Sequence, residues 1–118
     1  MKNVLHTTVV LTSLLLGLFL AGPRTLSAAG DPAKGKAIYE KHCVACHGPQ
    51  GKGDGPAGKM LKPPAADFTS AANKKKSEAE LMQVVENGKA GTAMVPWKSQ
   101  LSQAELNDLM GYVMTLRK

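Results

Sequence analysis

The stretch Cys43-Val44-Ala45-Cys46-His47 decides the fold of this chain. Its two cysteines stand three positions apart and a histidine directly follows the second, which is the attachment pattern of a c-type haem. The two intervening residues let both thiols face one way on a turn, so that each can bond to the same edge of one porphyrin. His47 can then bind the iron through a neutral ring nitrogen. The motif predicts one haem c, attached covalently through Cys43 and Cys46 and ligated by His47.

Three other uses of a Cys-x-x-Cys pair fit this sequence less well. A zinc site needs four ligands, and the nominal fourth, His42, directly precedes Cys43, although structural sites space their ligand pairs apart. A redox-active dithiol is expected beside a βαβ pattern, which the sequence lacks. A disulfide between the two cysteines of the chain would close almost no loop and would stabilise little. Haem attachment therefore remains the prediction.

The first residues have the pattern of an export signal. Lys2 supplies a positive start, a long apolar run follows, and small residues end the segment. We expect residues 1–29 to be a signal peptide, cleaved after Ala28 or Ala29, and residues 30–118 to form one small domain.

An uncleaved membrane anchor is the alternative for this leader, because the uncharged span 3–23 is nearly long enough to cross a bilayer. If the signal is cleaved, no stable membrane insertion is expected. Either way the domain is delivered outside the cytoplasm, and a bacterial periplasm is the predicted location.

The charge of the chain excludes one class of partner and favours another. The formal net charge is +6 at pH 7, and cleavage of the leader would leave +4. This is short of the charge density of a nucleic-acid binder, so no nucleic acid is expected. It favours redox protein partners with acidic docking surfaces, for which Lys36, Lys52 and Lys59 are candidate contacts. The run Lys74-Lys75-Lys76 is interpreted as a solvated face.

Capping patterns predict where the helices begin. Asp31 is a good N-cap and Pro32 a good first residue for a helix over 32–42. Two capping boxes predict a helix over 77–88 and another from 102 onward; they pair Ser77 with Glu80 and Ser102 with Glu105. An apolar stripe runs along one face of this last helix and consists of Leu106, Leu109, Met110, Val113 and Leu116. Glycines fill the stretch after His47 and no alternating strand pattern occurs, so the domain is predicted to be all-α with long loops.

The second axial position of the iron decides what such a haem can do. His42 is tied to the same side of the ring by Cys43, so methionine is the expected ligand. The candidates in the mature chain are Met60, Met82, Met94, Met110 and Met114. Met110 and Met114 fit core packing, whereas Met60 lies in the glycine-rich stretch and stays open. Met94 is favoured, because it occupies an irregular loop far from His47 whose backbone is restricted just beyond by a proline.

Together these residues resemble the class I cytochromes c, which are small monohaem electron carriers. The resemblance covers essentially residues 31–118 and rests on Gly35 and Tyr39, the Cys43–Gly48 motif, residues 62–68, Met94-Val95-Pro96-Trp97 and the closing helix. It implies a cytochrome c fold of three to five short helices wrapped around one haem, with Met94 as the second ligand. One departure is Val95, which separates the methionine from a proline that directly follows it in many members.

The resemblance also implies particular contacts. The first and last helices should cross closely, with Gly35 and Tyr39 facing Gly111 and Tyr112. The carbonyl of Pro63 or Pro64 should accept a hydrogen bond from the ligand histidine. Trp97 is expected to pack on the haem, to bond a haem propionate, or to be an ordinary core residue.

These observations predict a periplasmic monohaem c-type cytochrome with His47 and Met94 as iron ligands, which carries single electrons between redox partners and is not an enzyme. It would be a monomer or part of a complex. Two alternatives stay open: a haem c subunit of a larger periplasmic oxidoreductase complex, and a gas-binding or sensor cytochrome with an open iron.

Overall fold

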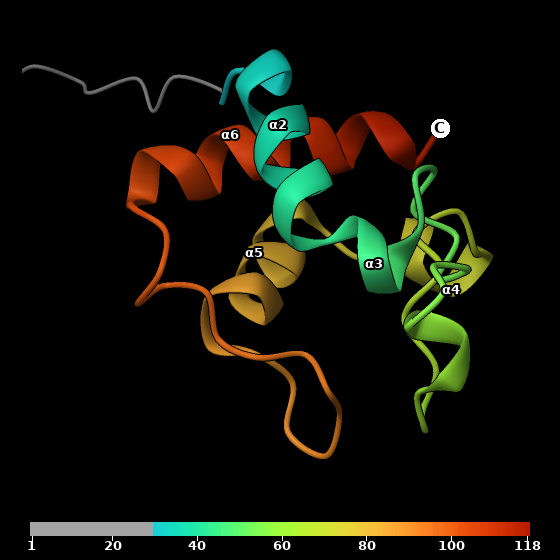
Figure 1. Ribbon diagram of the computed structural model, residues 1–118. Helices are drawn as coiled ribbons and strands as arrows, with labels where there is room; N and C mark the ends of the chain where they lie inside the picture. The colour runs from blue at the N-terminus through green and yellow to red at the C-terminus, as the bar shows by residue number, and fades with distance from the viewer. Residues whose placement is uncertain (1–29) are drawn as a thin grey trace, which may run out of the picture.

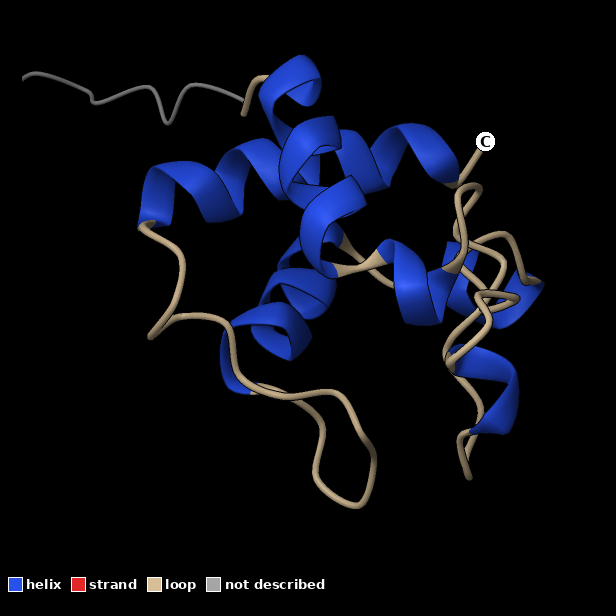
Figure 2. Cartoon of the chain, viewed as in Figure 1, coloured by secondary structure: helices blue, strands red, loops and turns tan. Residues whose placement is uncertain are grey.

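The computed structural model describes residues 30–118, and the predicted signal peptide, residues 1–29, lies outside the described residues. The elements in chain order are α2 (Pro32–His42), α3 (Val44–His47), the 3-10 helix η1 (Gly58–Met60), α4 (Ala71–Lys74), α5 (Glu78–Asn87) and α6 (Gln103–Leu116). Figures 1 and 2 show these helices joined by long loops, with no strand over residues 30–118. The predicted all-α class is confirmed.

The first and last of these helices, α2 and α6, cross in close contact (Figure 1). A Cβ atom placed on Gly35 would lie 1.9 Å from the carbonyl oxygen of Asp108, so the backbones meet with no room for a side chain. The rings of Tyr39 and Tyr112 pack edge to face, 5.3 Å apart. The predicted crossing is confirmed, although Gly111 faces Gly30 rather than Gly35.

The buried core is built mainly on one face of α6. Its buried apolar residues are Tyr39, Leu101, Leu106, Leu109, Met110 and Val113. The predicted stripe thus forms the core, except that Leu116 is only partly buried because it packs at the core's edge. By contrast, α5 has no buried residue. The rest of the chain therefore leaves the apolar face of α5 partly exposed, and another group is needed to cover it.

Side chains cap the helices as the sequence predicts. Asp31 accepts hydrogen bonds from the backbone N–H groups of Ala33 and Lys34 at the start of α2. Capping boxes begin α5 at Ser77 and α6 at Ser102, and in each the serine and a glutamate satisfy each other's backbone N–H groups. No helix within residues 30–118 has the length and hydrophobicity needed to cross a bilayer.

The cap of α6 gives a first testable expectation. Ser102→Ala removes the hydroxyl that accepts from the backbone N–H of Glu105 and should lower the free energy of unfolding by about 1 kcal/mol. Urea denaturation of the haem-loaded protein measures this. Ser99→Ala, at an exposed serine just outside the helix, is the matched control and should change little. Equal losses in both variants would contradict a specific role for the cap.

Candidate functional site

The cysteine motif lies where α2 passes into α3. Cys43 is both the C-cap of α2 and the N-cap of α3, and the last residue of α3 is His47. The buried hydroxyl of Tyr39 donates to the carbonyl of Gly48 at 2.7 Å, which ties α2 to the residue after the histidine. Burial raises the pKa of Tyr39 well above its ordinary value, so this hydroxyl stays a neutral donor. This bond therefore links the first helix to the end of the motif.

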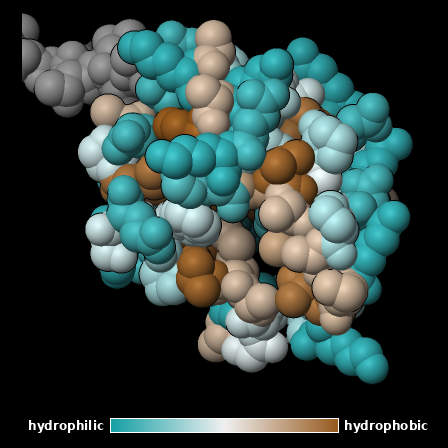
Figure 3. Space-filling view, viewed as in Figure 1, coloured by the Kyte–Doolittle hydropathy of each residue, from teal (hydrophilic) through white to brown (hydrophobic). Residues whose placement is uncertain are grey.

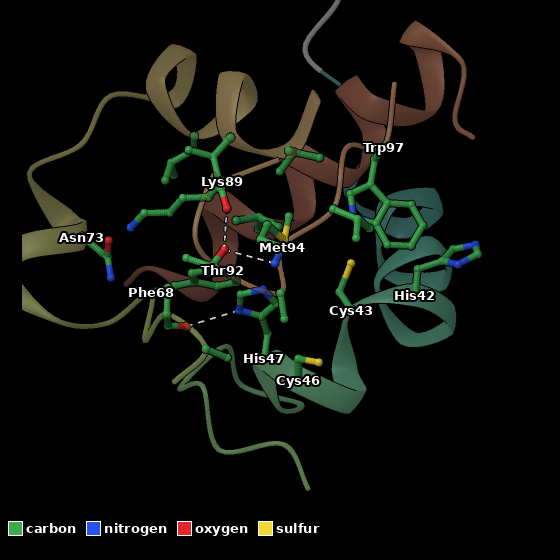
Figure 4. A pocket seen from close by; sticks show the side chains of 18 of the residues that line it. His42, Cys43, Cys46, His47, Phe68, Asn73, Lys89, Thr92, Met94 and Trp97 are labelled. Atoms are coloured by element: carbon green, nitrogen blue, oxygen red, sulfur yellow. Dashed lines mark hydrogen bonds between the residues drawn. The ribbon is translucent and has the colours of Figure 1, made fainter. Parts of the chain in front are cut away.

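A cavity of about 440 Å³ opens beside the motif, within the size range of pockets that hold cofactors. Cys43, Cys46 and His47 all line it, and Figure 4 shows their side chains along one of its walls. Figure 3 shows a hollow bordered by apolar residues on this face of the molecule. The structure thus brings the three predicted motif residues to one hollow.

The remaining walls of the cavity are mostly apolar. Leu81, Val84 and Val85 of α5 line it while remaining only partly buried, and the buried face of α6 contributes Leu109 and Met110. A large apolar group in this hollow would cover the half-exposed face of α5 and complete the core. The apolar lining and the adjacent cysteine motif fit a haem.

His47 is held in one orientation by two neighbours. Its Nδ1 lies 3.2 Å from the carbonyl oxygen of Ala66, and its ring stacks on Phe68 with centroids 4.7 Å apart. Because a carbonyl can only accept, this bond requires the proton on Nδ1 and leaves the lone pair of Nε2 free for a metal. Burial lowers the pKa of His47, and the hydrogen bond to Ala66 opposes this with a smaller effect. The lowered pKa favours the neutral ring that a metal ligand needs.

The prediction that Pro63 or Pro64 would supply this carbonyl is wrong, because the acceptor is Ala66. Both prolines line the cavity, but the chain runs on past them before it turns back. The turn is fixed when the N–H of Phe68 donates to the carbonyl of Gly51 at 2.7 Å. This closure, rather than the prolines, sets which carbonyl faces the histidine.

Neither the pKa of Cys43 nor the grouping of side chains in the described residues fits a redox or zinc pair. Burial raises the pKa of Cys43 to about 11, and the neighbouring Cys46 adds to the effect, so its thiol stays protonated at neutral pH. A redox-active dithiol needs the opposite, a lowered pKa. Over residues 30–118, no three His, Cys, Asp or Glu side chains lie where they could hold a metal ion together.

Met94 lines the same cavity from the loop between α5 and α6, and Figure 4 shows it on this loop above His47. The loop is braced at both ends. The carbonyl of Met94 accepts from the N–H of Lys89 at 3.0 Å, its own N–H donates to Oγ1 of Thr92 at 3.1 Å, and the N–H of Trp97 donates to Val85 at 3.0 Å. The methionine is therefore presented by a fixed backbone.

The other methionines of the mature chain are placed differently. Met60 is 79% exposed and lies outside the cavity lining, so the structure does not support it as a ligand. Met82 and Met114 pack against the core. Met110 reaches the cavity as well, but it is fully buried within α6. Met94 thus combines access to the cavity with a place on a loop.

Trp97 and His42 lie together near Cys43, with ring centroids 5.1 Å apart (Figure 4). Both line the cavity, and Trp97 is partly buried. Among the three roles expected for Trp97, this position favours packing beside the haem at the cysteine end.

Polar cavity residues were missed by the sequence reasoning: Asn73, Lys76, Lys89 and Thr92. The lysine run 74–76 is exposed, in agreement with its interpretation as a solvated face, and Lys76 also lines the cavity. The only signal was its position directly before the capping box of α5, which places the third lysine at a turn rather than on a helix face.

A family model described as cytochrome C oxidase, cbb3-type, subunit III, matches residues 30–113. The chain belongs to this family.

Relatives of this cbb3-type subunit III domain include short cytochromes and longer oxidase subunits. Cytochrome c-554(547) of Halothiobacillus neapolitanus is 33% identical over 91 residues, which cover 75% of this chain and 100% of that protein. The cbb3-type cytochrome c oxidase subunit CcoP of Azospirillum sp. (strain B510) is 36% identical over 94 residues and 75% of this chain. The match spans only 29% of the length of that subunit.

A solved structure of similar fold is the KustC0563 c-type cytochrome, with a TM-score of 0.58 and 26% identity over 71% of this chain and 98% of the other. The cytochrome c fold is therefore confirmed, with five α-helices among residues 30–118. The family and these relatives also confirm the resemblance to c-type cytochromes and, with it, the covalently bound haem c.

Proposed function

We propose that this protein carries single electrons outside the cytoplasm, with one haem c attached through Cys43 and Cys46 and its iron held between His47 and Met94. The observation that supports this most is the shared cavity. Two thiols, an imidazole with a free Nε2 and a loop thioether all line one apolar hollow.

The chain's own residues have separate roles in this proposal. When bound, the haem iron supplies the one-electron exchange. His47 is oriented by Ala66 and Phe68 and presents Nε2 to the metal. Met94 offers a neutral thioether, which raises the reduction potential relative to a second histidine. The apolar walls exclude water and the braced loops hold both ligands, so that little needs to move when the iron changes charge.

Partners would meet the protein through charge and a small interface. With a leader removed, the formal charge of +4 leaves a mildly basic domain, and Lys52 and Lys59 stand exposed in the stretch that follows the motif. We propose acidic redox proteins as partners, because such charges steer a rapid, weak encounter. In this proposal the protein passes electrons on and does not itself transform a substrate.

A second candidate is a haem subunit of a larger oxidase complex outside the cytoplasm. The similarity to the CcoP subunit of a cbb3-type oxidase favours it, although this chain matches only 29% of that subunit's length. Solubilisation of the source membranes separates the two functions. A subunit should co-purify with an oxidase, whereas a free carrier should be released without detergent.

Mass spectrometry of the exported protein tests the main proposal. Produced in a host with haem-attachment machinery, the polypeptide should begin at Ala29 or Gly30, carry the added mass of one haem, and have no free thiol. Its reduced absorption spectrum should be that of a haem with two strong-field ligands. The Cys43→Ala, Cys46→Ala double variant is the control and should leave the haem unattached. Free thiols in the parent protein, under conditions where known c-type cytochromes mature, would sink the proposal.

A further inference from the structure

The charged residues of the cavity are confined to one end. Lys76 and Lys89 both line it, and none of its lining residues is acidic. Figure 4 shows Asn73 and Lys89 on the side away from Cys43 and Cys46. Lys76 belongs to the same corner, because its Nζ donates to Oδ1 of Asn73 at 2.7 Å. An otherwise apolar hollow thus has a cationic end opposite its cysteines.

We propose that Lys76 and Lys89 bind the ionised propionates of the haem. This inference rests on the proposed function. A haem c carries its two thioether bonds on one edge of the porphyrin and its two propionates on the opposite edge. Attachment at Cys43 and Cys46 would therefore direct the carboxylates toward the far end of the cavity. Two ammonium groups there supply the charge-assisted hydrogen bonds that buried carboxylates need.

The backbone around Lys76 is held in place from two sides. The amide of Asn73 donates to the carbonyl of Asp67 at 2.7 Å and to Oγ of Ser70 at 3.1 Å. From the C-terminal end of α6, Nη2 of Arg117 donates to the carbonyl of Asn73 at 2.7 Å and to that of Lys76 at 2.6 Å. The turn between α4 and α5 is thus fixed by partners on both flanks, which preorganises Lys76 for an anion.

The other titratable groups that face the cavity do not compete for this role. They are His42, Cys43, Cys46 and His47. His42 lies beside Trp97 near the cysteines, and His47 is bonded to Ala66. Neither α5 nor α6 contributes an acidic side chain to the lining. The two lysines are therefore the groups that set the charge at the far end.

The three consecutive lysines provide a matched experiment. All three are exposed, but Lys76 also lines the cavity, whereas Lys74 and Lys75 do not. In haem-loaded protein, the Lys76→Gln, Lys89→Gln double variant should have a lower reduction potential. The expected fall is about 59 mV, which is a tenfold shift of the reduction equilibrium toward the oxidised form. Lys74→Gln with Lys75→Gln removes the same charge from open solvent and should shift it less than about twofold. Lys76→Arg keeps the charge and should leave the reduction potential close to that of the parent protein.

A second readout separates propionate binding from a general charge effect. In redox difference infrared spectra, the carboxylate bands of the haem propionates should move in the Lys76→Gln, Lys89→Gln variant and stay in place in the Lys74→Gln, Lys75→Gln variant. Equal potential shifts in the two double variants, or unmoved carboxylate bands in both, would overturn this inference alone. Absence of haem from the parent polypeptide would overturn the proposed function together with it.

Discussion

Met94→Ala lowers the reduction potential of the haem-loaded protein and opens its iron to carbon monoxide. The side chain lines the cavity from a loop whose backbone is held by Lys89, Thr92 and Val85, so truncation should remove the proposed ligand without releasing the loop. Axial ligands set haem potentials over roughly 0.8 V, and we expect a fall on the order of a tenth of that range or more. The cause is the loss of a thioether that favours reduced iron.

Two measurements check this expectation. The oxidised spectrum of the parent protein should contain a methionine–iron charge-transfer band that Met94→Ala lacks, and the reduced parent should bind carbon monoxide poorly while the variant binds it readily. Met60→Ala is the control, because Met60 is 79% exposed and outside the cavity lining. It should keep the band and the potential. A parent protein that binds carbon monoxide readily would instead favour the gas-binding alternative.

The motif residues could be predicted from the sequence because their chemistry is local. Cys43, Cys46 and His47 lie within one turn, so their spacing alone indicates that they act together. Met94 could be inferred less directly, from a loop position beside a proline. The starts of α2, α5 and α6 were visible because each cap is set by residues within three positions of the helix start.

Other parts of the site depend on how distant segments close on each other. The acceptor for His47 is Ala66 because the N–H of Phe68 bonds to Gly51, a contact that no local pattern in the sequence indicates. Lys76 differs from its two lysine neighbours in its hydrogen bonds: its Nζ donates to Asn73, and its carbonyl accepts from Arg117. Arg117 is far along the chain, so no local pattern indicates this contact. The short helix α4 was also missed, because its four residues have no periodicity to detect.

At the crossing of α2 and α6, helix propensity and packing predict opposite effects of Gly35→Ala on the stability of the protein. Alanine is the better helix former, so Gly35→Ala in an isolated helix would stabilise it by about 1 kcal/mol. In this fold the new Cβ would lie 1.9 Å from the carbonyl oxygen of Asp108 and 3.0 Å from the N of Leu109. Both are backbone atoms of α6 and cannot rotate away, so the two helices must separate.

We expect Gly35→Ala to lower the free energy of unfolding by about 3 kcal/mol or more, because separation of α2 from α6 loosens the packing of Tyr39 and Leu109 in the core. Against a total stability of about 5–15 kcal/mol, this should also reduce the yield of haem-loaded protein. Urea denaturation and haem content measure both effects. Gly111→Ala is the graded control: its Cβ would meet the carbonyl oxygen of Gly30 at 2.7 Å, a less severe backbone contact than the 1.9 Å at Gly35, so it should cost less stability. A Gly35→Ala protein as stable as the parent would mean that the two helices are not in backbone contact, and the position of the motif at the end of α2 would then need another explanation.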